Sequence, residues 1–269
     1  MFDCHMHCNH SADCRTSIDD MVEAAIGKGM RYIAFTDHLD RDYLYDDSPD
    51  KDIRQLDIQN HINEFDRVKE KYKGRIEIAC GVECSYSKSA ENDYCSILDN
   101  YHFDLILNSV HSIKGVDCYH KEFYIGKSKR QAYEEYLLAI LDSINAKYPF
   151  DIVTHIGYVC RKAPYENKDM NYSEFDDIID CILKGIINKD ISLELNSKND
   201  GTNSPFLPYL TIIDRYIELG GREFTFGSDA HGVSRVDDKY DIVKDYLISQ
   251  NINYINIYKN RQKTKIDIR

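Results

Sequence analysis

Short apolar, β-branched segments alternate with longer amphipathic segments along most of the chain. The short segments predict seven strands, at residues 2–7, 31–38, 75–83, 102–111, 149–157, 191–197 and 222–231. The amphipathic segments predict helices at residues 17–29, 57–72, 129–148, 173–189 and 207–221. Glycines at 27, 29, 220 and 221 stand where two of these helices should end. Strands that alternate with helices indicate parallel βα units, and seven of them favour an α/β barrel.

The length of 269 residues fits one such barrel, and no linker or repeat divides the chain. We therefore expect a single domain over residues 1–269. No run of about 18 apolar residues is present, so no membrane-spanning helix is expected. The first ten residues lack a basic stretch and an apolar signal core, which favours the cytoplasm. The nine cysteines are odd in number and form no CxxC pair, which argues against a disulfide frame or a zinc knuckle.

The formal net charge is −12, from 34 basic and 46 acidic side chains. Nucleic acid is therefore not expected as the main partner, because a phosphate backbone needs a basic surface. A small phosphorylated substrate would have to be attracted locally, by metal ions or by a few arginines. The acidic stretch from Asp40 to Asp52 is expected to be a solvated loop after the second strand, with a substrate lid as the alternative.

Histidines and carboxylates gather where the predicted strands end. His5 and His7 are one residue apart in the first strand, so both imidazoles can point at one ion. The other positions of this kind are His38, Glu83, His111, His155, Asp229 and His231. In a βα barrel the C-terminal ends of all strands open on one face, where active sites form. The pattern therefore predicts a site at that face.

Imidazole and carboxylate together suit Zn, Fe or Mn more than Ca or Mg. The set is too large for one tetrahedral ion, so two or three divalent ions are expected, and Glu83 could bridge two of them. His10, His61, His102 and His120 lie outside the pattern, and His61, within a helical pattern, is expected on the surface.

These residues, in this order, resemble the polymerase-and-histidinol-phosphatase (PHP) superfamily. The resemblance runs from residue 3 to about residue 235 and is carried by an ordered set of motifs rather than by one of them. The motifs are His5-x-His7 with Asp13, Thr36-Asp37-His38, Gly81-Val82-Glu83, Ser109-Val110-His111, His155 and Ser228-Asp229-Ala230-His231. The chain length, Arg161 shortly after His155, and Tyr258-Lys259-Asn260-Arg261 are similar to the histidinol-phosphatase branch.

The resemblance implies a distorted (β/α)7 barrel with a trinuclear metal centre at the C-terminal ends of its strands. Carried over by motif position, His5, His7, Glu83 and Asp229 would hold the first ion. Glu83, His111 and His155 would hold the second, and Asp13, His38 and His231 the third. Arg161 would face the substrate phosphate, with Lys198 as a second cationic contact. Asp229, Asp13 or His231, or a water that they hold, would protonate the leaving group.

The implied activity is the hydrolysis of L-histidinol phosphate in histidine biosynthesis. One alternative is a phosphoesterase of the same superfamily that acts on another monoester or on a nucleotide. A second is a metal-binding accessory module without catalysis, and a third is a metal-dependent amidohydrolase. The amidohydrolase would require a lysine at a strand end, and no such lysine stands out. The oligomeric state is left open.

Overall fold

The computed structural model of the protein describes residues 1–41, 56–199 and 202–269. Its main sheet has eight strands, of which a short one, β3 (His38–Asp40), pairs with β4 beside seven parallel strands that follow the order β1-β2-β4-β5-β8-β9-β10. Their bounds are β1 Phe2–Met6, β2 Tyr32–Phe35, β4 Glu77–Ser85, β5 Leu105–Ser109, β8 Ile152–Val153, β9 Ser192–Asn196 and β10 Phe224–Gly227. The last strand returns to the first: Asp229 N donates to the carbonyl of His5, and His7 N to that of Ala230. The sheet is therefore a nearly closed barrel, which confirms the predicted fold class.

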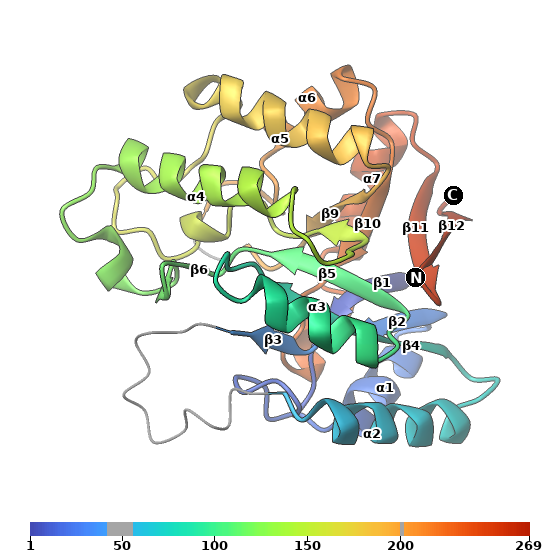
Figure 1. The fold of residues 1–269 in the computed structure, drawn as a ribbon. Helices are drawn as coiled ribbons and strands as arrows, with labels where there is room; N and C mark the ends of the chain where they lie inside the picture. Colours follow the sequence, from blue (N-terminus) through green and yellow to red (C-terminus); the bar gives the residue numbers. More distant parts are fainter. Residues whose placement is uncertain (42–55, 200–201) are drawn as a thin grey trace.

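A helix follows each strand of the barrel, and Figure 1 shows these helices on the outside of the sheet. They are α1 Ile18–Gly27, α2 Ile58–Lys71, α3 Glu91–Asn100, α4 Lys129–Ser143, α5 Asp176–Asn188, α6 Leu210–Glu218 and α7 Tyr240–Ser249. The five predicted helices are confirmed with shorter ends, whereas α3 and α7 were not predicted. Short 3-10 helices lie in the loops: η2 Lys121–Tyr124, η3 Tyr158–Cys160, η4 Tyr172–Glu174 and η5 Val233–Arg235. Among the described residues, no helix is long and apolar enough to cross a membrane.

Local sequence explains where these elements begin and which face they bury. Ser17 accepts a hydrogen bond from the backbone N of Asp20 and so caps α1, which then buries Ile18, Met21, Val22 and Ala25. Strand β4 is buried from Ile78 to Ser85 on both faces, as expected of a parallel strand between helices and a barrel interior. The core therefore lies between the helices and the sheet.

The predicted second strand is two strands in the structure. It ends at Phe35, and a short strand, β3 (His38–Asp40), then pairs with β4 in a register that places His38 opposite Glu83. After β5 comes a small hairpin, β6 (Ser112–Ile113) and β7 (Val116–Asp117). Both additions stand at the C-terminal ends of the barrel strands, where they add side chains to that face.

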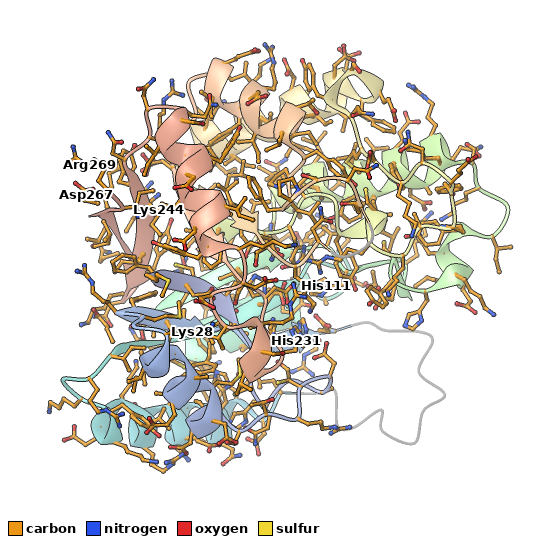
Figure 2. The ribbon with its side chains drawn as sticks, turned by 180° about the vertical axis from the view of Figure 1, so that it is seen from behind. Lys28, His111, His231, Lys244, Asp267 and Arg269 are labelled. Carbon is orange, nitrogen blue, oxygen red and sulfur yellow. The ribbon has the colours of Figure 1, made fainter. Side chains whose placement is uncertain are left out.

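A C-terminal hairpin, β11 (Tyr254–Lys259) and β12 (Gln262–Asp267), was not predicted. Its Tyr258 hydroxyl hydrogen-bonds with that of Ser192, and Tyr32 donates to the carbonyl of Tyr258. Ser192 and Tyr32 begin their strands, so the hairpin covers the N-terminal end of the barrel. In Figure 2, Asp267 and Arg269 accordingly lie far from His111 and His231. The Tyr258–Arg261 motif thus lies at the N-terminal end of the barrel, which this hairpin covers.

We expect Arg261→Ala to destabilise the fold by about 1–3 kcal/mol, because a buried acceptor would lose a charged partner. Arg261 Nε donates to Asp151, which is only 8% exposed. Burial raises the pKa of Asp151 and Arg261 opposes that rise, so the variant should raise this pKa further. The loss of folding stability in Arg261→Ala should then be largest at neutral pH. It should shrink at lower pH, as the Asp151 carboxyl group is protonated.

Urea unfolding at pH 7 and pH 5 measures this effect. Arg269→Ala is the matched control, since Arg269 also pairs with an aspartate, Asp267, but both side chains are more than half exposed. An Arg261→Ala variant as stable as the control would contradict the structural role.

Candidate metal centre

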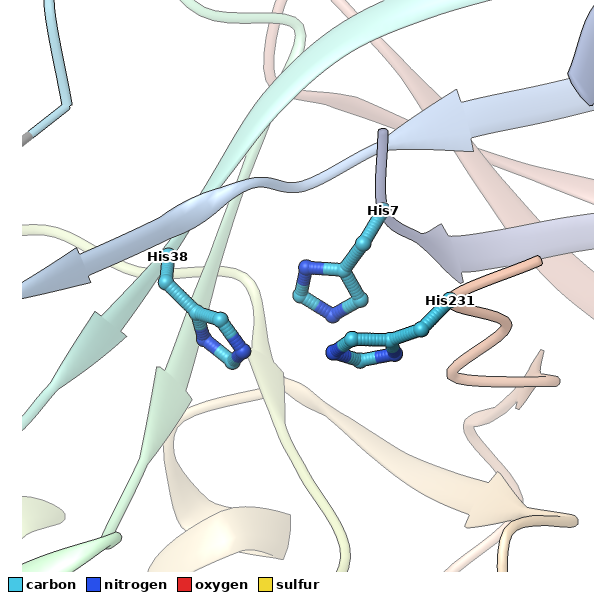
Figure 3. A group of neighbouring side chains, drawn as sticks. All are labelled: His7, His38 and His231. Atoms are coloured by element: carbon cyan, nitrogen blue, oxygen red, sulfur yellow. The ribbon is translucent and has the colours of Figure 1, made fainter. Parts of the chain in front are cut away.

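All nine predicted metal ligands lie at the C-terminal end of the barrel. Among residues 1–41, 56–199 and 202–269, four overlapping groups of three have ligand atoms within 4.8 Å of one another. These groups are His5, His7 and Asp229; His5, Glu83 and His155; His38, Glu83 and His111; and His7, His38 and His231. The ninth residue, Asp13, approaches from the loop after β1, and its Oδ2 is 3.0 Å from His231 Nε2. Figure 3 shows His7, His38 and His231 converging from three separate segments of the chain.

Glu83 stands at the middle of this set, fully buried in β4. Its Oε1 lies 2.8 Å from His155 Nε2 and 3.1 Å from His111 Nε2. Its Oε2 lies 2.9 Å from His38 Nδ1 and 3.4 Å from His5 Nε2. The two oxygens therefore face two different histidine groups, which is the arrangement expected of a carboxylate that bridges two ions.

The chemistry of the donors fits divalent metal ions. Within the described ranges, Glu83 Oε2 accepts no hydrogen bond, although imidazole nitrogens surround it. An unpaired buried carboxylate oxygen is costly, whereas a cation shared with the neighbouring nitrogens would satisfy it. Imidazole and carboxylate are ligands of Zn and similar ions.

Burial and neighbouring charges set the protonation of these groups. Burial opposes ionisation of Glu83, but the coulombic effect of His5, His111 and His38 holds the pKa of Glu83 well below its usual range. Burial, aided by His231 and His38, lowers the pKa of His7 well below 6.5, and burial lowers the pKa of His155 to about 4. Burial opposes the charged form of His5, His38 and His111 as well, but neighbouring carboxylates raise the pKa of all three, to about 10 for His111. Metal binding would therefore release protons from these three imidazoles.

Two of the candidate ligands adopt backbone conformations that non-glycine residues rarely take. Asp229 has a φ of 51° and His155 a φ of 21°. Hydrogen bonds from their backbone N atoms hold them, to the carbonyl of His5 and to Glu194 Oε2 respectively. Such strain costs about 1–3 kcal/mol per residue and clusters at functional sites, where the surrounding structure fixes it.

Both predicted cationic contacts lie beside Asp229. Arg161 directly follows η3 and is 5% exposed; its Nη2 donates to Asp229 Oδ2 at 3.1 Å and to Asn196 Oδ1 at 3.0 Å. Lys198 Nζ lies 3.0 Å from Asp229 Oδ1 and 3.0 Å from His231 Nδ1. Two positive charges therefore adjoin the candidate metal ligands.

A cavity of about 340 Å³ opens onto these groups. Its lining residues include Asp13, His38, His111, Arg161, Lys198 and Asp229, and also Asp40, Asp117, Tyr119, His120 and Tyr158. A larger hollow of about 530 Å³, lined by Lys69, Arg75 and Glu77 among others, lies at the other end of the barrel. The smaller cavity is the one that joins metal ligands, cations and room for a small substrate.

The prediction that His61 lies on the surface was wrong. Its side chain is fully buried and packs against Phe65, with ring centroids 4.6 Å apart. The reason is helical spacing, because Ile58, His61, Phe65 and Val68 form the buried face of α2. His120 lies outside the ligand set, as predicted, but lines the cavity.

Most of the acidic loop predicted from Asp40 to Asp52 lies outside the described residues. Asp40 itself is described, and its Oδ1 is 3.3 Å from His111 Nδ1.

Sequence reasoning gave no role to two buried polar residues beside the ligands. Glu194, in β9, hydrogen-bonds with His5 Nδ1, and Ser11 hydrogen-bonds with His7 Nδ1. A signal for Glu194 was present, because a carboxylate in the middle of the apolar strand 191–197 needs a buried partner. Ser11 lies in a loop without periodicity, so its place beside His7 appears only in the fold.

The PHP domain family matches residues 3–198, which is most of the chain. This chain belongs to the PHP family. A relative from Clostridium acetobutylicum, named as a probable histidinol-phosphatase, is 32% identical over 86% of this chain and 86% of its own length. The histidinol-phosphatase of Lactococcus lactis subsp. lactis is 31% identical over 87% of this chain and 85% of its own length. Among PHP proteins, the chain falls in the histidinol-phosphatase branch.

A solved PHP structure supports the same placement. The histidinol phosphate phosphatase from Lactococcus lactis subsp. lactis superposes with a TM-score of 0.87 at 28% identity, and 98% of each chain is covered. That crystal structure contains zinc, L-histidinol and phosphate. The agreement extends over the whole barrel, including the C-terminal hairpin that lies beyond the matched family domain.

Proposed function

We propose that this PHP protein is a metal-dependent phosphomonoesterase that hydrolyses L-histidinol phosphate to L-histidinol and phosphate, a step of histidine biosynthesis. The observation that carries the proposal is the position of Glu83 between two histidine groups, with Arg161 and Lys198 beside the same cluster. The names of the relatives and the ligands of the Lactococcus structure support the choice of substrate.

The proposed centre holds two or three ions of Zn, Fe or Mn. His5, His7, Glu83 and Asp229 would hold one ion, and Glu83, His111 and His155 a second. Asp13, His38 and His231 would hold a third. When bound, such ions polarise phosphoryl oxygens and lower the pKa of a nearby water towards neutrality. Among the described residues, the donor group His5, His7 and Asp229 supports the first of these ligand sets. The other groups within 4.8 Å combine Glu83 with His5 and His155, Glu83 with His38 and His111, and His7 with His38 and His231.

The side chains of Arg161 and Lys198 would bind and orient the phosphate of the substrate. The guanidinium of Arg161 is planar and can donate two parallel hydrogen bonds to phosphate oxygens, while Lys198 adds a second positive charge. Both already hold the carboxylate of Asp229, whose oxygens mark where anionic oxygen atoms fit. Positioning and charge stabilisation of this kind supply most of the acceleration in phosphate ester hydrolysis.

The leaving alkoxide needs a proton, which we assign to Asp229, Asp13 or His231, or to a water that they hold. The first two line the cavity, and His231 Nε2 is 3.0 Å from Asp13 Oδ2. Asp40 and Asp117 line the cavity too and would offer negative charge to the ammonium group of the substrate.

We further propose that residues 1–269 form one catalytic domain and that nucleic acid is not its partner. A cytoplasmic location stays a prediction.

We expect about three metal ions per chain after purification without chelator, because the nine candidate ligands are too many for one ion. Elemental analysis of Zn, Fe and Mn on the purified protein measures this directly. Full activity with one ion or none would contradict the multinuclear centre.

Phosphate release before and after metal removal tests the proposed function. The holoenzyme should release phosphate from L-histidinol phosphate, the chelator-treated protein should not, and added metal should restore the activity. An accessory module would instead bind metal and release no phosphate under any of these conditions, which would overturn the proposal.

A further inference from the structure

Glu194 fixes the orientation of His5. Its side chain is buried in the middle of β9, and its Oε1 lies 2.5 Å from His5 Nδ1. Its Oε2 accepts hydrogen bonds from the backbone N of His155 and from Asn196 Nδ2, at 2.8 and 3.0 Å. A carboxylate only accepts, so the shared proton belongs to His5 Nδ1. Metal binding by His5 would therefore use the lone pair of Nε2, which lies 3.4 Å from Glu83 Oε2.

The chain makes room for this contact at Gly227. A Cβ at this position would collide with Glu194 Oε1 and would come within 2.8 Å of His5 Cβ. The pairing of Glu194 and His5 therefore depends on a glycine in the adjacent strand β10.

A second chain of hydrogen bonds, from His7 through Ser11 to Asp37, also has only one possible donor-to-acceptor direction. His7 Nδ1 lies 2.9 Å from Ser11 Oγ, and Ser11 Oγ lies 2.6 Å from Asp37 Oδ1. The Asp37 carboxylate also accepts from the backbone N and the thiol of Cys8. The single hydroxyl proton of Ser11 goes to Asp37, so Ser11 can only accept from His7 Nδ1. His7, like His5, would therefore bind metal through Nε2.

These two sets of hydrogen bonds orient His5 and His7 so that their Nε2 atoms point to the same place. His5 Nε2 and His7 Nε2 are 3.1 Å apart, so the ring nitrogens opposite the two buried partners lie side by side. His7 Nε2 also lies 3.6 Å from Glu83 Oε2 and 3.5 Å from Asp229 Oδ1. Two lone pairs and two carboxylate oxygens that converge in this way suit a cation between them.

We propose that Glu194 and the Ser11–Asp37 pair are positioning residues that fix His5 and His7 as Nε2 ligands without binding the metal themselves. The inference rests on the metal centre of the proposed function and adds residues outside its ligand set. Buried groups that hold the far nitrogen of a metal-binding histidine typically contribute 10- to 100-fold to metal affinity.

The test measures Zn²⁺ affinity of the metal-free protein by competition with a chromogenic chelator, for Glu194→Ala, Glu194→Gln, Ser11→Ala and Ser11→Thr. We expect the two alanine variants to bind the tightest Zn²⁺ about 10- to 100-fold more weakly. Ser11→Thr keeps the hydroxyl and should recover most of the affinity. Glu194→Gln keeps an acceptor but not the charge, and should fall between wild type and Glu194→Ala. The visible spectrum of Co²⁺-substituted protein should change in the alanine variants, since it reports ligand geometry.

Glu91→Gln is the matched control, because Glu91 is 2% exposed, lies at the start of α3 and pairs with Lys88 and Lys147. Wild-type affinity and an unchanged Co²⁺ spectrum in both alanine variants would overturn the inference. If an alanine variant does not fold, as judged by circular dichroism, the Gln and Thr variants decide: Glu194→Gln must bind more weakly than Glu91→Gln, and Ser11→Thr must not. Failure of the wild type to bind Zn²⁺ would instead overturn the proposed function.

Discussion

Glu83→Ala should lower kcat/KM for the phosphomonoester by roughly 10²- to 10³-fold or more, well beyond the effect of His38→Ala. Loss of one preorganised electrostatic contact to a transition state typically costs about 10²- to 10³-fold in kcat, and each 1.36 kcal/mol is tenfold in rate. Glu83 is fully buried and faces two histidine groups, whereas the side chain of His38 is 18% exposed at the edge of the cluster. Loss of Glu83 should therefore disturb two ions, and loss of His38 only one.

The comparison needs turnover at saturating metal, together with metal content, so that weak binding is not mistaken for lost chemistry. Glu83→Gln is the informative companion, because it keeps the size of the side chain and removes its charge. Similar, mild losses in Glu83→Ala and His38→Ala would argue against a bridging carboxylate.

Arg161→Ala should raise KM for a phosphomonoester, lower kcat as well, and leave metal content near that of the wild type. The guanidinium is 5% exposed and lies at the cavity next to Asp229, within reach of a substrate phosphate. Loss of a charge-assisted hydrogen bond costs about 1.5–3 kcal/mol, which corresponds to roughly ten- to 150-fold in kcat/KM.

Arg161→Lys should recover only part of the loss, because an ammonium group cannot reproduce two parallel hydrogen bonds. Lys162→Ala serves as the control, since it removes the neighbouring charge from an exposed position. If Arg161→Ala keeps the kcat/KM of the wild type, Arg161 is not the phosphate contact, and Lys198 becomes the next candidate.

The convergence of the candidate ligands was predictable because two simple rules act on their positions. Alternate residues of a strand share a face, and the C-terminal ends of parallel strands share one end of a barrel. His5, His7, Glu83 and His155 obey both rules, so their convergence follows from sequence position and needs no long-range information.

The remaining features depend on contacts that a local hydrophobic pattern does not encode. Strand β12 is mostly exposed and is held by its pairing with β11, so its sequence lacks the alternation of apolar and polar residues that burial of one face would produce. Helix α3 buries only Glu91 and Tyr94 and shows little apolar pattern. Ser11 meets Asp37 only because the loop after β1 folds over the end of β2.

The most direct test of the account is kcat/KM of the metal-replete protein on L-histidinol phosphate, compared with p-nitrophenyl phosphate, a sugar phosphate and a nucleoside monophosphate. We predict that L-histidinol phosphate exceeds each of the others by at least about a hundredfold, because a site that pairs with a substrate's polar groups rejects analogues that lack them. A different monoester or nucleotide with an equal or higher kcat/KM would contradict the proposed substrate, and the absence of phosphate release from every compound would contradict the phosphatase itself.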